Sequence, residues 1–204
     1  MHSARKTLLL TGLMLCATLA QADGDPVRGK LLADTCMGCH GIKGYRNAYP
    51  SYRVPMLGGQ QEEYLVLSLQ GYKNESRAHL TMQAQAASLS EQDMRDIASF
   101  LVSQGEVESG SAKSNGQITR GKEKAVVCAA CHGQNGVSAA PNWPTLAGQH
   151  EDYLVQVLKQ YKNGERTDAV MAGQVVNLSA DDIKDLAAYF AAQPGLFTAS
   201  YTGE

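Results

Sequence analysis

The sequence lacks an excess of positive charge, and it lacks any apolar run long enough to cross a bilayer comfortably. Once Arg5 and Lys6 of the N-terminal segment are set aside, 16 basic residues face 20 acidic ones, a net charge of −4. Nucleic-acid binding needs a basic surface, so this class of function is excluded. No stretch alternates apolar and polar residues for long enough to predict a strand, and we therefore expect an all-α fold.

The one long apolar run lies at the N-terminus. Residues 7–20 carry no charge, follow the basic pair and lead into an A-x-A pattern that ends at Ala22. This arrangement is typical of a secretory signal peptide, so we expect residues 1–22 to be cleaved and the protein to be exported. An uncleaved membrane anchor is the alternative. Cys16 lies in this segment without the small preceding residues of a lipoprotein acceptor.

The rest of the chain contains two copies of one unit. Residues 55–77 and 144–166 are identical at 13 of 23 positions. The copies are offset by 89 residues here but by 92 at the cysteines, so the first copy has three extra residues in the loop after His40. We expect two tandem domains, at 23–105 and 117–204, joined by a linker at 106–116 that is rich in Gly, Ser and Glu.

Apolar periodicity and capping residues predict the helices of each copy. An Asp-Pro pair begins the first helix, and [ST]-x-x-[DE] patterns begin the last helix of each copy. We expect helices from Asp25 toward Cys36, over 118–128, 60–71 and 149–161, and after Ser90 and Ser179.

Each copy also contains the pattern C-x-x-C-H, at Cys36, Cys39 and His40 and at Cys128, Cys131 and His132. One helical turn puts residues i and i+3 on the same side with i+4 beside them, so two thiols can form thioethers with haem while the imidazole lies beneath the iron. A redox disulfide would need a βαβ context, and a zinc ribbon would place its cysteine pairs roughly 15–20 residues apart. The pattern therefore predicts two covalently bound haem c groups.

The sixth iron ligand is predicted from the repeat. From residue 117 onward the only methionine is Met171, and Met82 occupies the matching position in the first copy. The other methionines of the first copy do not match one in the second: Met37, Met56 and Met94. We expect His40 and Met82 to ligate one iron and His132 and Met171 the other, with both methionines on irregular segments. His79 and His150 have no histidine at the matching position, so we expect surface or local hydrogen-bonding roles.

Taken together, these features resemble the dihaem class I cytochromes of the cytochrome c4 family. The resemblance covers the whole chain after residue 22 and is carried by CMGCH and CAACH, PMLGGQ and PTLAGQ, and YKNESR and YKNGER. It implies two cytochrome c folds packed about a pseudo-twofold axis and a periplasmic protein, often associated with a membrane. It also implies that a prolyl carbonyl orients each proximal histidine, from Pro50 or Pro55 and from Pro141 or Pro144.

The same resemblance implies electron transfer from a quinol-oxidising complex toward a terminal oxidase, through redox protein partners. Two filled axial positions leave no site for a substrate, so we expect no enzymatic activity; a dihaem peroxidase would need one open or replaceable ligand. A dihaem electron-transfer subunit of a periplasmic dehydrogenase complex would have nearly the same sequence and stays as the alternative function.

The extra loop of the first copy differs from its counterpart in charge. It contains Lys43, Arg46 and Arg53 interleaved with tyrosines, whereas residues 134–143 carry no charge. We expect this loop to present a basic docking surface to an acidic redox partner. The alternative is that the three bases neutralise haem propionates or are simply solvated.

Overall fold

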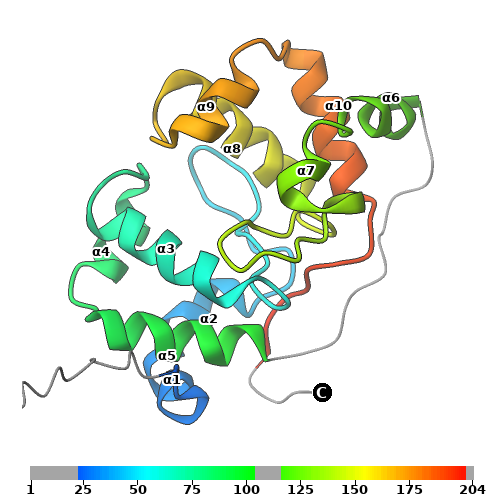
Figure 1. Ribbon diagram of the computed structural model, residues 1–204. Helices are drawn as coiled ribbons and strands as arrows, with labels where there is room; N and C mark the ends of the chain where they lie inside the picture. The colour runs from blue at the N-terminus through cyan, green and yellow to red at the C-terminus, as the bar shows by residue number, and fades with distance from the viewer. Residues whose placement is uncertain (1–22, 104–115, 201–204) are drawn as a thin grey trace, which may run out of the picture.

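The computed structural model describes residues 23–103 and 116–200. Figure 1 shows two helical halves, α1 to α5 below and α6 to α10 above. The helices of the first half are α1 (Pro26–Leu32), α2 (Asp34–His40), α3 (Glu62–Lys73), α4 (Leu80–Ala86) and α5 (Glu91–Val102). Those of the second are α6 (Gly116–Lys124), α7 (Ala129–His132), the 3-10 helix η1 (Gln134–Gly136), α8 (Glu151–Asn163), α9 (Ala169–Val175) and α10 (Ala180–Ala191). Extended pairing within the described ranges is limited to isolated bridges, which confirms the all-α prediction.

Side-chain caps fix where the helices begin. The Asp25 carboxylate accepts hydrogen bonds from the backbone N–H groups of Val27 (2.9 Å) and Arg28 (3.3 Å), and proline takes the first helical position of α1. Ser90 begins α5 and Ser179 begins α10, each through a reciprocal capping box with the acidic residue three positions on. Each such cap contributes about 1 kcal/mol. These predicted starts are confirmed.

The first and last helices of each half cross at a glycine. A Cβ placed on Gly29 of α1 would lie 1.9 Å from the Asp96 carbonyl oxygen of α5, and one on Gly121 of α6 would lie 2.0 Å from that of Asp185 in α10. Only glycine allows backbones to approach so closely. The repeat-matched glycines therefore set the crossing that closes each half.

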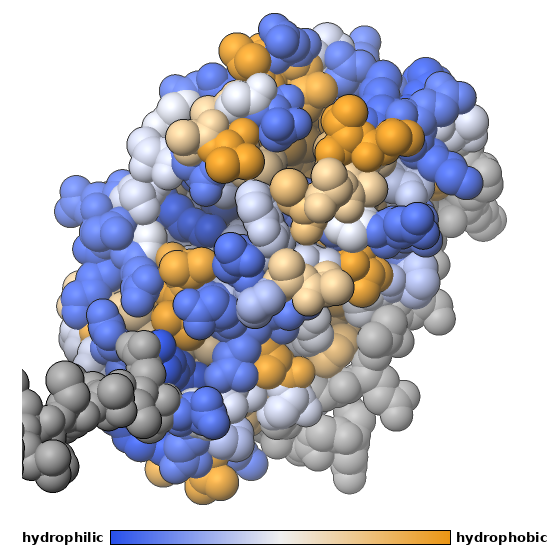
Figure 2. Space-filling model, viewed as in Figure 1, coloured by the Kyte–Doolittle hydropathy of each residue, from blue (hydrophilic) through white to orange (hydrophobic). Residues whose placement is uncertain are grey.

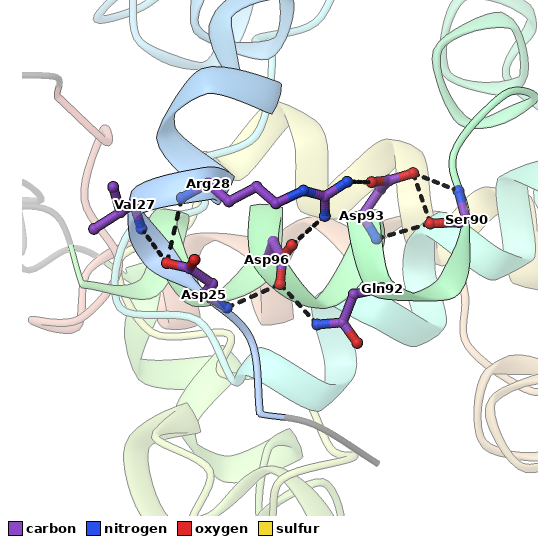
Figure 3. A network of polar contacts seen from close by, with 7 residues as sticks. All are labelled: Asp25, Val27, Arg28, Ser90, Gln92, Asp93 and Asp96. Carbon is purple, nitrogen blue, oxygen red and sulfur yellow. Dashed lines mark hydrogen bonds and ion pairs between the residues drawn. The ribbon is translucent and has the colours of Figure 1, made fainter.

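A buried carboxylate joins the same helices. Asp96 is 1% exposed and accepts hydrogen bonds from the Asp25 N–H at 2.8 Å, from Gln92 at 2.8 Å and from the guanidinium of Arg28 (Figure 3). Burial alone would raise the pKa of Asp96, but these hydrogen bonds and the Arg28 charge hold the pKa below its ordinary value. The first and last helices of this half are thus tied by a hydrogen-bonded charge.

The second half repeats this arrangement with a different cation set. Asp185 is 2% exposed and accepts hydrogen bonds from Arg120 at 2.8 and 2.9 Å and from Lys124 at 2.7 Å. These bonds lower the pKa of Asp185. The burial of Asp96 and Asp185 was not predicted from the sequence, because an acidic residue on an amphipathic helix ordinarily faces solvent.

Two separate apolar cores lie within the two halves, as the predicted helix faces require. Met94, Ile97 and Leu101 of α5 are buried in the first core, and Leu186 and Phe190 of α10 are buried in the second. The tail after α10 leaves its own half, as the red segment in Figure 1 shows. Its Phe197 exchanges two backbone hydrogen bonds of 3.1 Å with Gly58, and Ala199 is fully buried in the first core.

The two halves meet about an approximate twofold axis. The Gln60 amide donates to the Thr145 carbonyl at 3.0 Å and accepts from the Thr145 N–H at 2.8 Å. The Gln149 amide bonds Met56 in the same way, at 2.9 and 3.0 Å. Each glutamine therefore satisfies both backbone groups of a residue in the other half.

The extra loop breaks this symmetry. Arg46 and Arg53 both form ion pairs of 3.0 Å with Asp152 of α8, across the boundary between the halves. Burial alone would raise the pKa of Asp152, but Arg53 and Arg46 lower it. The single carboxylate of Asp152 offsets one of these two positive charges, and both arginine side chains stay exposed, so the docking surface remains a prediction.

Candidate cofactor sites

All eight residues predicted to bind the cofactors line one cavity of about 680 Å³ that runs through both halves. The cavity joins Cys36, Cys39, His40 and Met82 of the first half with Cys128, Cys131, His132 and Met171 of the second. Apolar side chains from both cores complete its wall, among them Leu65, Ile97, Leu101, Leu154, Leu186 and Phe190. The structure thus gathers both predicted constellations in a space suited to a large apolar ligand.

The cysteine motifs lie on single helical turns, as their spacing requires. Cys36, Cys39 and His40 belong to α2, while Cys128 is the N-cap of α7 and the His132 N–H donates to its carbonyl at 3.0 Å. None of the four cysteines within the described ranges forms a disulfide, and all four are half-buried. Both thiols of each pair therefore lie beside the histidine on the cavity wall.

Each motif histidine is held by a prolyl carbonyl. The distance from His40 Nδ1 to the Pro55 oxygen is 2.8 Å, and that from His132 Nδ1 to the Pro144 oxygen is also 2.8 Å. A carbonyl can only accept, so Nδ1 carries the proton and Nε2 keeps a lone pair for a metal. Of the four candidate prolines, the structure selects Pro55 and Pro144.

Burial favours the ligating form of both rings. It lowers the pKa of His40 and of His132, although the prolyl carbonyls oppose the shift. Both imidazoles are therefore neutral at neutral pH. Neutral imidazole is the form that binds a metal.

Met82 and Met171 lie in short helices, α4 and α9, and not in the irregular segments that we expected. A side chain three residues earlier causes the difference. His79 Nδ1 accepts from the Met82 N–H at 3.3 Å, and the Asp168 carboxylate accepts from the Met171 N–H at 2.8 Å, so each begins a helix at that point. Both methionines are half-buried.

The remaining methionines and histidines have other surroundings. Met37 and Met94 are buried in the first core, whereas Met56 also borders the cavity and has its backbone bound by Gln149. The role of His79 as a helix cap confirms the local hydrogen-bonding role expected of it. His150 occupies the N-cap position of α8, where its backbone N–H donates to the side-chain oxygen of Gln149 at 3.0 Å.

Two arginines that the sequence analysis did not predict border the cavity where the halves meet: Arg166 is buried and Arg77 is half-buried. The Arg77 guanidinium lies 5.1 Å from the ring centre of Tyr64, and the Arg166 guanidinium lies 5.9 Å from that of Tyr153. The sequence feature that could have indicated them is the repeated Tyr-Lys-Asn-x-x-Arg segment, in which the arginine occupies the same position in both copies.

The arginines also test whether haem fits this cavity. Arg166 is 4% exposed, and its Nη1 has no hydrogen-bond partner. Within residues 23–103 and 116–200, no acidic side chain forms an ion pair with Arg77 or Arg166. A buried cation needs an anion, and haem carries a pair of propionates on an apolar ring. Apolar walls, paired thiols, buried imidazoles and an unmatched cation all fit haem.

The two ends of the cavity differ. Trp143 lies edge-on to the His132 ring at 6.2 Å, whereas the matching residue in the first half is Val54. At the first end, Thr35 forms a 3.2 Å hydrogen bond to Gln85. The residue matching Thr35 is Val127, which is 70% exposed. Figure 2 shows apolar residues gathered on the part of this face that lies over α7 and α9.

Comparison with known proteins shows that both halves of the chain match the same protein family. Residues 26–105 and 118–193 match the family model for cytochrome c. The chain is 31% identical over 205 residues to cytochrome c-552 of Acidithiobacillus ferridurans, covering 93% of this chain and 88% of that protein. It is 29% identical over 175 residues to the thiosulfate dehydrogenase electron acceptor of Thiomonas intermedia, covering 79% and 80%. The solved structure of reduced recombinant cytochrome c4 from Pseudomonas stutzeri matches with a TM-score of 0.72 and 31% identity, over 83% of this chain and 99% of that one.

The family match and the motifs together fix the cofactors. Each matched region contains one C-x-x-C-H motif, with its cysteines at positions 36 and 39 or at 128 and 131. The chain therefore carries two covalently attached haem c groups, one in each half.

Proposed function

This chain belongs to the cytochrome c family, and within it to the dihaem cytochrome c4 proteins, and we propose that it relays electrons in a periplasmic respiratory chain toward a terminal oxidase. Proteins of the cytochrome c4 family transfer electrons and are not enzymes. The observation that supports the proposal best is the gathering of two complete Cys, Cys, His and Met sets around one cavity.

We propose that His40 and Met82 would hold the iron of the first haem, and that His132 and Met171 would hold that of the second. The Pro55 and Pro144 carbonyls accept the Nδ1 protons, which leaves the Nε2 lone pair of each ring free to bind a metal. Bound haem supplies a one-electron couple, whose ferrous form a thioether ligand stabilises. Two filled axial positions would leave no site for peroxide, which is why we favour a carrier over a dihaem peroxidase.

We further propose that residues 1–22 are a signal peptide removed after Ala22, and that 23–105 and 117–204 are the two domains, joined by a linker at 106–116. Residues 1–22 and most of the linker lie outside the described residues. In the part of the chain that the structure describes, no helix has the length and apolarity to span a membrane. The expected partners are a quinol-oxidising complex as donor and a terminal oxidase as acceptor, with peripheral association to the membrane that holds them.

A second function is favoured by one comparison. The relative from Thiomonas intermedia is named as the electron acceptor of a thiosulfate dehydrogenase and spans most of this chain. We therefore keep the alternative that this chain is the dihaem electron-transfer subunit of a periplasmic dehydrogenase complex.

Electron exchange with native membranes separates the two functions. Oxidised holoprotein is mixed with membranes and quinol, and reduced holoprotein with the same membranes in air. Reduction in the first mixture and oxidation in the second support the respiratory relay. Reduction only by a periplasmic extract and its dehydrogenase substrate, together with co-purification of that dehydrogenase, would favour the subunit role.

A further inference from the structure

The chain segment after α10 lies across both loops whose prolyl carbonyls hold the motif histidines. Its successive residues Leu196 and Phe197 bond to one loop each. The Leu196 N–H donates to the Ala147 carbonyl at 2.8 Å, and Phe197 exchanges two backbone hydrogen bonds of 3.1 Å with Gly58. Ala147 and Gly58 occupy matching positions of the repeat, each three residues after the proline. One short segment of the second half therefore contacts the same point of the two loops.

The side chain of Phe197 packs against the loop of the first half. A Cβ added to Gly58 would lie 2.1 Å from its ring, and one added to Gly59 would lie 3.0 Å from it. Phe197 is buried, and Ala199 just after it belongs to the core of the first half. The second loop has Ala147 where the first has Gly58, so the glycine is explained by the ring that lies against it.

A short stretch of backbone connects this contact to His40. Pro55 lies three residues before Gly58, and its carbonyl accepts the Nδ1 proton of His40 at 2.8 Å. A turn follows within the loop, closed by a 3.2 Å hydrogen bond between the Leu57 carbonyl and the N–H three residues on. Neither Gly58 nor Phe197 is among the described residues that line the cavity, so an effect of the ring on the cofactor must pass through the loop.

We propose that Phe197 is a positioning residue for His40: from the second half it holds the Pro55 loop in place and so sets the strength of the hydrogen bond at Nδ1. The proposal rests on the proposed ligation of the first iron by His40, and not on the identity of any partner. A hydrogen bond at Nδ1 makes Nε2 more basic, and a more basic ligand stabilises ferric iron. A residue of the second half thereby tunes the reduction potential of the haem in the first half.

Removing the ring should raise the reduction potential of the first haem. Without Phe197 the loop can move away from His40, the hydrogen bond at Nδ1 weakens, and the ferric form loses stabilisation. The second haem should change less, because Ala147 is bound by the backbone of Leu196, which the substitution keeps. A role confined to packing would instead lower the stability of the fold and leave both potentials in place.

The test is a potentiometric titration of purified dihaem holoprotein, in which the first haem is the one that loses its methionine band in Met82→Ala. For Phe197→Ala we expect the ferrous-to-ferric equilibrium constant of the first haem to rise about threefold, which is about 28 mV for a one-electron couple. Phe100→Ala is the matched control, because it removes another buried phenylalanine, one that belongs to the first core and does not line the cavity. It should lower the stability of the fold and change neither potential.

A double-mutant cycle tests the contact itself. Gly58→Ala puts a Cβ where the ring lies, so it should shift the potential of the first haem in the parent but much less in Phe197→Ala. Phe197→Leu keeps part of the packing and should raise the same potential by less than Phe197→Ala does. With Phe100→Leu as its control, it decides the matter if Phe197→Ala yields no holoprotein.

Three results would overturn the proposal. The first is a potential of the first haem that falls in the Phe197 variants, and the second is one that equals that of the matching Phe100 variants. The third is a cycle in which the shifts of Gly58→Ala and Phe197→Ala simply add. An error in the ligand assignment would be seen separately, in the spectrum of the parent protein.

Discussion

Gln60 and Gln149 reach across the domain boundary in opposite directions, and each side-chain amide satisfies both backbone groups of one buried residue in the other half, at 2.8–3.0 Å. Both glutamines are themselves buried. The relationship is symmetric, since the two glutamines and their two targets occupy matching positions of the repeat. The contact therefore does not depend on the extra loop, which only the first half has.

Replacing Gln149 with Leu should leave the N–H and carbonyl of Met56 buried without partners. An unsatisfied buried group costs about 1–3 kcal/mol and two such groups are left, so we expect the free energy of unfolding to fall by about 2–6 kcal/mol. Denaturant unfolding of the holoprotein measures this, with the exposed Gln134→Leu as control. Gln60→Leu should cost the same within about 1 kcal/mol. A large effect at only one of the two positions would contradict the symmetric contact.

Asp96→Asn tests the buried carboxylate through pH. The pKa of Asp96 is lower in the folded protein than in the unfolded chain, so its charge stabilises the fold above the unfolded pKa of about 3.9 and that contribution is lost as pH falls further. The parent should therefore be more stable than Asp96→Asn at pH 7, and the difference should shrink below about pH 4. Thermal melts of both proteins across this range measure it. The melting temperature of Asp181→Asn, a change at an exposed position, should follow that of the parent at every pH. A difference in melting temperature between Asp96→Asn and the parent that does not change with pH would contradict a stabilising role for the charged carboxylate of Asp96.

Gly121→Ala should separate α6 from α10. The added Cβ would lie 2.0 Å from the Asp185 carbonyl oxygen, so the helices must move apart, at a cost of about 1–3 kcal/mol. Gly173→Ala provides the matched control within a helix, because nothing lies within 4 Å of its added Cβ. The control should raise the melting temperature slightly, and Gly121→Ala should lower it. Equal melting temperatures for the two variants would show that the crossing tolerates a side chain.

Asp168→Ala should loosen the segment that carries Met171. Loss of the N-cap costs about 1 kcal/mol and removes the acceptor for the Met171 N–H. We expect the methionine-ligated spectrum of the second ferric haem to be lost at lower temperature than in the parent, while the first haem is unaffected. Asp168→Asn retains an acceptor and should behave like the parent. If the spectra of both haems in Asp168→Ala are lost at the same lowered temperature, the N-cap formed by Asp168 does not act on Met171 alone.

The C-x-x-C-H turns and the helix caps could be predicted from the sequence because each depends on residues close together along the chain. The repeat could be predicted because it needs only a comparison of one stretch of sequence with another. The choice of Pro55 over Pro50 could not, since it depends on how the extra loop folds back over His40. Asp96 looked like an ordinary surface acid because its partners lie about 70 residues earlier. The ion pairs of Arg46 and Arg53 could not be predicted either, because only the packed halves bring Asp152 to them.

The most direct test of the carrier assignment is the absorption and electron paramagnetic resonance spectrum of the fully oxidised, purified holoprotein. We predict two low-spin ferric haems, each with the charge-transfer band of methionine ligation. Met82→Ala should remove the band from one haem and Met171→Ala from the other. A high-spin signal or a bis-histidine spectrum at either haem of the parent protein would contradict the assignment of two closed, electron-transferring sites.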